Sequence, residues 1–241
     1  MFAAIFAFAL LIIHVAAQIS SSFFPACSRR DPNIEKCILN NMDNFKDKLC
    51  EGIPELNIPP NDPFIVDKLV ISETPDIKLY NKNMQIRGLC DYNVSYFHAD
   101  MENFHFDLDL VFNHIRVNTT YDFDIRILIP IVQKGPLYIT VDDIGAKVNL
   151  DFKIVTRNGK MYTYLAKMKL NLDIKKYTTQ YGADGEQFNQ LQEIIHNFIG
   201  QNQEEIINSF KPALEEAISK QIVSSTNNIV KHFTLDQLFS E

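Results

Sequence analysis

The sequence predicts an α+β fold in which one face of an antiparallel β-sheet is buried under a long C-terminal α-helix. From Ile77 to Ile174 almost every second residue is apolar, which is typical of strands with one face in the core and one in water. From Phe188 to Ile222 the apolar residues instead recur at steps of three and four, which is typical of an amphipathic helix. Alternating strands of this kind favour an antiparallel over a parallel sheet.

The chain begins with an apolar run from Phe2 to Ile13, followed by the small residues Ala16 and Ala17. The run is too short to span a bilayer, and signal peptidase prefers small residues at its cleavage site. We therefore predict a signal peptide at residues 1–17 and a single mature domain at residues 18–241, secreted to the extracellular space. The alternative for the apolar run is a buried N-terminal helix or a membrane anchor.

A short N-terminal helix is predicted over residues 32–49. Asp31 suits the N-cap, and Pro32 suits the first helical position, where its missing N–H costs nothing. The apolar residues of this segment then fall on one face, namely Ile34, Ile38, Met42, Phe45 and Leu49. The pattern indicates an amphipathic helix that packs on the sheet.

The chain has 4 Cys, which in an exported protein favour disulfides over metal or redox chemistry. A Cys27–Cys37 bridge would hold the N-terminal arm on the first helix. A Cys50–Cys90 bridge would tie the end of that helix to a strand. The sequence itself allows all three pairings of the four residues.

A proline-rich connector at residues 52–63 leads into seven to nine predicted strands between Phe64 and Tyr177. The Asn158-Gly159 pair is the strongest hairpin signal in the chain. Breaks between strands are predicted near residues 74–75, 81–83, 98–102, 118–119, 134–136, 142–146 and 157–160. In the late helix we expect Pro212 to produce a kink, because the helical pattern resumes beyond it. The tail from His232 onwards is expected to pack back on the domain.

The net charge of -7 argues against nucleic acid and against anionic membranes as main partners. We expect a monomer without stable membrane insertion. Asn93 and Asn118 each begin an Asn-x-Ser/Thr sequon, which predicts glycosylation at surface positions of a secreted protein.

Several motifs together resemble the takeout/juvenile-hormone-binding protein family of insects. They cover essentially the whole mature chain, and their combination is specific although each alone is not. The matching segments are the Cys27 and Cys37 pair around residues 31–33, then residues 52–56, 58–60, 62–63, 86–89, 157–160, 210–216 and 235–239. Two features depart from the family pattern: Asn61 stands where Leu is common, and Cys50 and Cys90 are not part of the core pattern.

The resemblance implies that the sheet is strongly curved and wraps around the C-terminal helix, as in the lipid-transfer domains of the bactericidal/permeability-increasing type. It also implies an elongated apolar tunnel for juvenile hormone, another terpenoid or a fatty-acid-like lipid. Members of the family are secreted carriers rather than enzymes, with roles linked to hormone transport, feeding and circadian behaviour.

Candidate residues for the ligand site are the apolar side chains that face the predicted interior. The high content of Phe (18) and the absence of Trp suit a smooth apolar lining. Tyr138 and Tyr164 could each offer a hydroxyl group to a polar end of the ligand. The other candidates are Phe123, Ile125, Ile127, Leu137, Ile139, Leu150, Phe152, Met168, Leu170, Phe188, Leu191, Ile195, Phe198 and Phe210. Ordinary core packing is the alternative for each apolar residue.

Motifs for catalysis and for cofactors are missing from the sequence. There is no Gly-x-Ser-x-Gly or His-Glu-x-x-His motif, and no glycine-rich phosphate loop. His105, Asp107 and Asp109 match no zinc spacing, and their alternation places them on the wet face of a strand. We therefore predict no enzyme activity, no metal and no cofactor. The main hypothesis is a carrier of a small hydrophobic ligand, and the alternative is a secreted signalling protein with a packed interior that acts through a cell-surface receptor. A third hypothesis is lipid transfer at membranes, as in the wider relatives of the fold, and the acidic charge counts against it.

Overall fold

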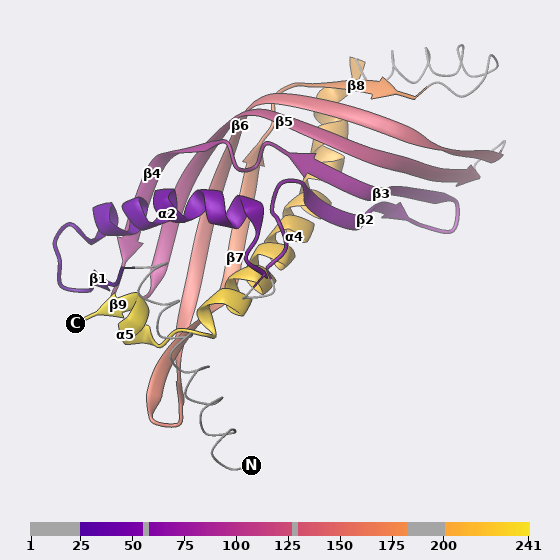
Figure 1. The fold of residues 1–241 in the computed structure, drawn as a ribbon. Helices are drawn as coiled ribbons and strands as arrows, with labels where there is room; N and C mark the ends of the chain where they lie inside the picture. Colours follow the sequence, from indigo (N-terminus) through magenta and orange to yellow (C-terminus); the bar gives the residue numbers. More distant parts are fainter. Residues whose placement is uncertain (1–24, 55–57, 127–129, 183–200) are drawn as a thin grey trace.

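The computed structural model describes residues 25–54, 58–126, 130–182 and 201–241 (Figure 1). The predicted signal peptide lies outside these residues. The elements are β1 (Cys27–Ser28), α2 (Ile34–Glu51), β2 (Phe64–Glu73), β3 (Ile77–Arg87), β4 (Tyr92–Asp100), β5 (His105–Arg126), β6 (Pro130–Arg157), β7 (Lys160–Asp173), β8 (Tyr177–Tyr181), α4 (Gln203–Val230), α5 (Leu235–Leu238) and β9 (Phe239–Ser240).

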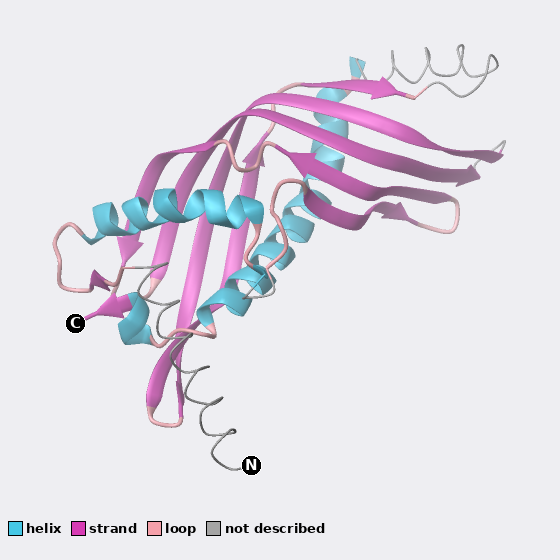
Figure 2. Cartoon of the chain, in the orientation of Figure 1, coloured by secondary structure: helices cyan, strands magenta, loops and turns pink. Residues whose placement is uncertain are grey.

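Strands β2 to β8 form one antiparallel sheet built on the two long strands β5 and β6 (Figure 2). One half of β5 pairs with β4 and the other half with β3. In the same way, β6 pairs with β7 along one half and with β8 along the other. The short strands β1 and β9 form a separate parallel pair that joins the two ends of the described chain.

Helix α4 closes the curved sheet. The main path through the sheet runs β2-β3-β5-β6-β7, and α4 contacts both β7 at one end and β2 at the other. One helix can reach both ends only if the sheet bends around it. The predicted fold, an antiparallel sheet that curves around a long C-terminal helix and is preceded by a short helix, is confirmed.

The main core lies between the inner face of the sheet and the middle of α4. Its buried members come from β2, β3, β5, β6 and β7, and Ala213, Leu214, Ala217 and Ile218 of α4 pack against them. A second cluster forms around Phe106, where Ile38 and Met42 of α2 cover the sheet. The long helix therefore covers one part of the inner face and the N-terminal helix another.

Three predicted strand breaks are wrong, because β5 and β6 continue through them. At residues 118–119, Asn118 is exposed and Thr119 is buried with its Oγ1 donating to the carbonyl of Lys82, so the alternation is unbroken. At residues 134–136 the strand also continues. At residues 142–146 Asp143 has a positive φ, and β6 bends without ending. The predicted break at residues 81–83 is a register shift inside β3.

The two-residue turn at Asn158-Gly159 is confirmed. Both residues have positive φ angles, 50° and 73°, as a tight hairpin with the twist of its strands requires. The turn joins β6 to β7, and this hairpin extends beyond the neighbouring described elements, α5 and β9 (Figure 1).

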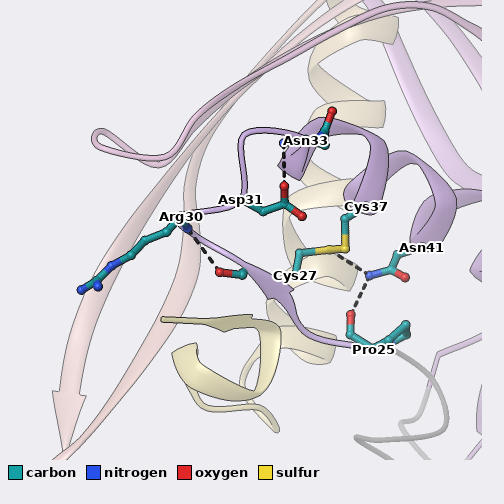
Figure 3. The surroundings of a disulfide bond; sticks show 8 residues. Pro25, Cys27, Arg30, Asp31, Asn33, Cys37 and Asn41 are labelled. Atoms are coloured by element: carbon teal, nitrogen blue, oxygen red, sulfur yellow. Dashed lines mark hydrogen bonds between the residues drawn. A yellow bond between two sulfur atoms is a disulfide. The ribbon is translucent and has the colours of Figure 1, made fainter.

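The N-terminal helix begins at Ile34, two residues later than predicted. Asp31 does not cap it as expected; its Oδ1 instead accepts a hydrogen bond from the N–H of Asn33, 2.8 Å away, in a turn before the helix (Figure 3). The Cys27–Cys37 disulfide holds the arm beside the helix, and Asn41 donates to both the carbonyl of Pro25 and Sγ of Cys27. These contacts fix the start of the described chain.

A second disulfide joins Cys50 to Cys90. It ties the end of α2 to the turn between β3 and β4 and closes a long loop. On the chain-entropy model, a loop of this length stabilises the folded state by about 4 kcal/mol. Both bridges therefore act on the placement of α2 over the sheet.

Candidate functional site

Two side chains of α4 attach the helix to the outer edge of β7. Asn227 accepts a hydrogen bond from the N–H of Leu165 (2.8 Å) and donates to the carbonyl of the same residue (3.0 Å). Glu215 accepts from the N–H of Leu172 (2.7 Å). All three bonds use backbone groups at an edge that has no neighbouring strand. The two attachments are about 18 Å apart along the helix, given its rise per residue.

A groove opens between these attachments. It has a volume of about 740 Å³ and is open to solvent. Its walls are six consecutive residues of β7, one residue of β6 and one side of α4. The lining residues are Asn149, Ala166, Lys167, Met168, Lys169, Leu170, Asn171, Glu215, Glu216, Ser219, Lys220 and Val223.

The groove is amphipathic because of the alternation of β7. Met168 and Leu170 face inward, and they also pack against the buried clusters of the interior. Lys169 lies between these two residues in the sequence, and Lys167 precedes Met168. Both lysines are exposed, because their side chains are on the outer face of the strand. An occupant could therefore bury an apolar chain against Met168 and Leu170 and keep a polar group near the lysines.

Acidic side chains of α4 complete the polar side of the groove. Lys211 lies 3.7 Å from Glu215, and both side chains are largely shielded from solvent. Lys220 forms an exposed ion pair with Glu216, and this hydrogen bond lowers the pKa of the Glu216 carboxyl below its ordinary value. The polar walls therefore carry both signs of charge.

Side chains pack closely around the middle of α4, whereas the inward side chains beside the groove are less completely buried. None of the residues of α4 is fully buried, although most are half-buried. Leu150, Phe152, Met168 and Leu170 face inward but are also only half-buried. Among the described residues, the structure thus shows an open groove that connects to partly covered apolar side chains.

The structure brings part of the predicted site together. Met168 and Leu170 line the groove, and Leu150 and Phe152 belong to the same apolar cluster next to it. The ring of Phe152 meets Phe106 edge to face, with centroids 5.7 Å apart. These residues form one continuous apolar surface.

Other predicted residues lie towards the opposite end of the sheet. Leu137 is buried and Ile139 packs against the main core. Phe123 stacks on Tyr121 with ring centroids 5.3 Å apart. Phe210 is half-buried on α4. None of these four is among the residues that line the groove.

Tyr138 and Tyr164 do not point towards the interior. Tyr138 is 46% exposed and alternates with the inward Leu137 and Ile139. Tyr164 lies between the buried residues Thr163 and Leu165, so its side chain is on the other face of β7. Of the remaining candidates, Ile125 lies in β5, whereas Ile127, Phe188, Leu191, Ile195 and Phe198 lie outside the described residues.

Two tyrosines that our sequence reasoning passed over face the interior instead. Tyr177 and Tyr181 of β8 pair with Val141 and Leu137, both buried, and antiparallel partners share a face. Burial raises the pKa of both hydroxyls, that of Tyr181 to about 12. The buried hydroxyl of Tyr177 has no hydrogen-bond partner among the described residues. The alternation of residues 177–181 is the signal that could have revealed them.

The two predicted glycosylation sites lie on the outer face of the sheet. Asn93 is exposed on β4 and Asn118 is exposed on β5, where it pairs with the exposed Tyr138. Both side chains are therefore accessible to a modifying enzyme.

The histidines and carboxylates of the outer face bond to one another. His105 Nδ1 lies 2.6 Å from Asp151 and its Nε2 lies 3.1 Å from Asp107. His98 Nδ1 lies 3.0 Å from Glu35 of α2. Within residues 25–54, 58–126, 130–182 and 201–241, no group of three such side chains is arranged to hold a metal ion.

Comparison with known proteins identifies the family. The sequence profile of the haemolymph juvenile hormone binding protein family matches residues 2–240, which is nearly the whole chain. The chain belongs to this family. Membership assigns it a binding role and not an enzymatic one.

Individual relatives either match only a part of this chain or match it at low sequence identity. The juvenile hormone-binding protein of Manduca sexta is 35% identical over 81 residues, which are 33% of this chain and 34% of that protein. The chain thus matches about a third of the length of this curated relative. The crystal structure of Takeout 1 from Epiphyas postvittana has the same fold, with a TM-score of 0.72 and 17% identity over 86% of this chain and 96% of that chain. The crystal structure of lipopolysaccharide binding protein gives a TM-score of only 0.38.

The described helices are all too short or too polar to cross a bilayer.

Proposed function

We propose that this protein is an extracellular carrier that binds a small hydrophobic ligand with its apolar part in the groove between β7 and α4. The observation that carries the proposal is the groove itself, whose inward residues Met168 and Leu170 continue into the apolar interior. Its volume of about 740 Å³ lies in the range typical of small-molecule sites.

The energetics of apolar burial support such binding. Burying roughly 400 Å² of apolar ligand surface contributes about 10 kcal/mol. Association costs several kcal/mol of lost translational and rotational freedom. With a cost of about 4 kcal/mol, the remaining free energy of about 6 kcal/mol corresponds to a Kd of tens of micromolar, without a catalytic group or a cofactor.

The chemistry of the groove indicates the class of ligand. An elongated terpenoid or a fatty-acid-like lipid combines an apolar chain with one polar end, which matches the apolar and charged walls. Juvenile hormone is one candidate, in line with the name of the family and of the Manduca sexta relative. The two disulfides suit an oxidising extracellular environment.

Filling the groove tests this proposal. Ser219 is half-buried and lines the groove, so Ser219→Trp places a bulky ring where the ligand would lie. Loss of about 60 Å² of buried ligand surface weakens binding by about tenfold. The measurement is the Kd of a fluorescent fatty acid probe, by direct titration.

Ser224→Trp is the matched control, because Ser224 is exposed on the same helix and does not line the groove. We expect this variant to bind the probe like the wild type. Equal affinity of the wild type and both variants would place the ligand elsewhere. Absence of any probe binding by the wild type would favour the alternative of a packed signalling protein that acts through a receptor.

A further inference from the structure

Charge is distributed very unevenly in this acidic protein. Between residues 145 and 176, which include the β6–β7 hairpin, there are eight Lys or Arg and only two Asp. This segment therefore carries a net charge of +6, and the rest of the chain carries -13. The overall charge of -7, which argues against an anionic partner, conceals a basic surface.

The basic residues of the hairpin are available to a partner. All eight are exposed. Of the two Asp residues, Asp151 is bound by His105 and Asp173 lies 3.9 Å from Lys175. Within the described part of the chain, no carboxylate lies within ion-pair distance of Arg157, Lys160 or Lys167.

The tip of the hairpin also exposes apolar side chains. Ile154 is 42% exposed and Met161 is 40% exposed. Ile154 pairs with Thr163 and Met161 with Thr156, so the two apolar side chains share one face of the hairpin. Arg157 and Lys160 pair with each other on the other face. The tip is therefore amphipathic, and it projects beyond the neighbouring described elements, α5 and β9 (Figure 1).

We infer that the tip of the β6–β7 hairpin docks this protein on an anionic lipid surface. Exposed cations are attracted to acidic headgroups, and the two apolar side chains can enter the boundary between headgroups and acyl chains. The alternative anionic partner is a sulfated polysaccharide, which would bind the cations alone and leave Ile154 and Met161 without a role. Exposed cations together with exposed apolar side chains therefore favour a membrane.

Docking by this hairpin would also bring the groove close to lipid. Lys167 and Lys169 continue the basic surface along β7 and line the groove. A carrier that touches a membrane at this edge could load or release its ligand there. This consequence rests on the proposed function, whereas the docking itself does not.

Vesicle flotation with the full mature protein tests the inference. The probes are phosphatidylcholine vesicles with and without about 30 mol % phosphatidylserine, an anionic lipid. We expect the wild type to float with the anionic vesicles only, and added salt to weaken this binding. Arg157→Glu combined with Lys160→Glu should reduce the bound fraction about tenfold or more. Ile154→Ser combined with Met161→Ser should also reduce it.

Each double variant has a matched control away from the tip of the hairpin. Lys36→Glu combined with Lys134→Glu makes the same change in net charge at exposed positions, and Ile65→Ser combined with Val132→Ser removes exposed apolar side chains. Both controls should float like the wild type, and circular dichroism verifies that all variants fold.

Three results would overturn the inference: no flotation of the wild type at low ionic strength, equal losses in the control variants, or retention on heparin without binding to vesicles. Uptake of a lipid probe in solution, measured on the same variants, separates docking from carriage. If the hairpin tip serves docking and the groove serves ligand binding, the variant with both Arg157→Glu and Lys160→Glu loses vesicle binding but still takes up the lipid probe in solution.

Discussion

His105 shows how single residues stabilise the outer face of the sheet. Its ring lies between Asp151 on β6 and Asp107 on β5, and Asn149 also donates a hydrogen bond to Asp107. Hydrogen bonding to Asp151 is the main cause that raises the pKa of His105 above its ordinary value; burial opposes it as the second-largest effect, and Asp107 adds to the rise. The hydrogen bond from Asn149 lowers the pKa of Asp107. The arrangement joins two neighbouring strands through one imidazole ring.

The raised pKa predicts a pH dependence. Because the folded state holds the proton of His105 more tightly than the unfolded chain does, the resulting stability is fully present below the ordinary pKa of 6.5 and is lost as the pH rises through the higher folded value. We expect the NMR titration midpoint of the His105 ring to lie above 6.5, and Asp151→Asn to lower it. A midpoint at or below 6.5 in the wild type would contradict this account.

For single residues, the sequence predicts well which face of a strand a side chain lies on. It predicts less well which side chains contact one another. Alternation places Met168 and Leu170 inside, where the groove is found. The choice of Tyr138 and Tyr164 as polar anchors goes against the same alternation, since their neighbours are the inward residues. The position of the groove depends on how α4 lies against β7, and no local pattern encodes that contact.

The groove depends on how helix α4 is attached to strand β7. Asn227 satisfies both backbone groups of Leu165, a residue that is only 1% exposed. An Asn side chain can do this because its amide has the same donor and acceptor as a backbone peptide group. Without it, the edge of β7 would leave two buried polar groups unpaired.

We therefore predict that Asn227→Ala lowers the free energy of unfolding by about 1–3 kcal/mol, the cost of unpaired buried groups. Urea denaturation followed by circular dichroism measures this. Asn228→Ala is the control, because the side chain of Asn228 bonds only the exposed Lys231 among the described residues, and it should change the free energy of unfolding by less than about 0.5 kcal/mol. Equal effects of the two substitutions would show that the attachment contributes little.

Element types are predictable from this sequence, and element lengths are less so. Residues that usually form turns interrupt the apolar pattern of β5 and β6, yet the strands continue through them. Gly135 illustrates the reason: a Cβ there would come within 2.8 Å of the Tyr121 hydroxyl oxygen, so glycine is needed for close contact with a ring and not for a turn. Packing between strands, which the sequence does not display, decides such positions.

In the described part of the molecule as a whole, one helix closes a curved sheet and leaves a groove between itself and β7. The centre of α4 packs against the main core, and the side of the helix between its two attachments forms one wall of the groove beside β7. The sequence predicts the two layers and their order from its change of period. The incomplete filling of the space between them is visible only in the structure.

We propose that an apolar ligand from outside the chain binds in this groove and covers the inward side chains that line it. Native mass spectrometry of the protein purified from its natural source tests it most directly. We predict a bound apolar compound that adds to the protein mass and is removed by organic extraction, after which the protein takes up a lipid probe again. A single unliganded mass, with no uptake of any lipid probe, would contradict the claim.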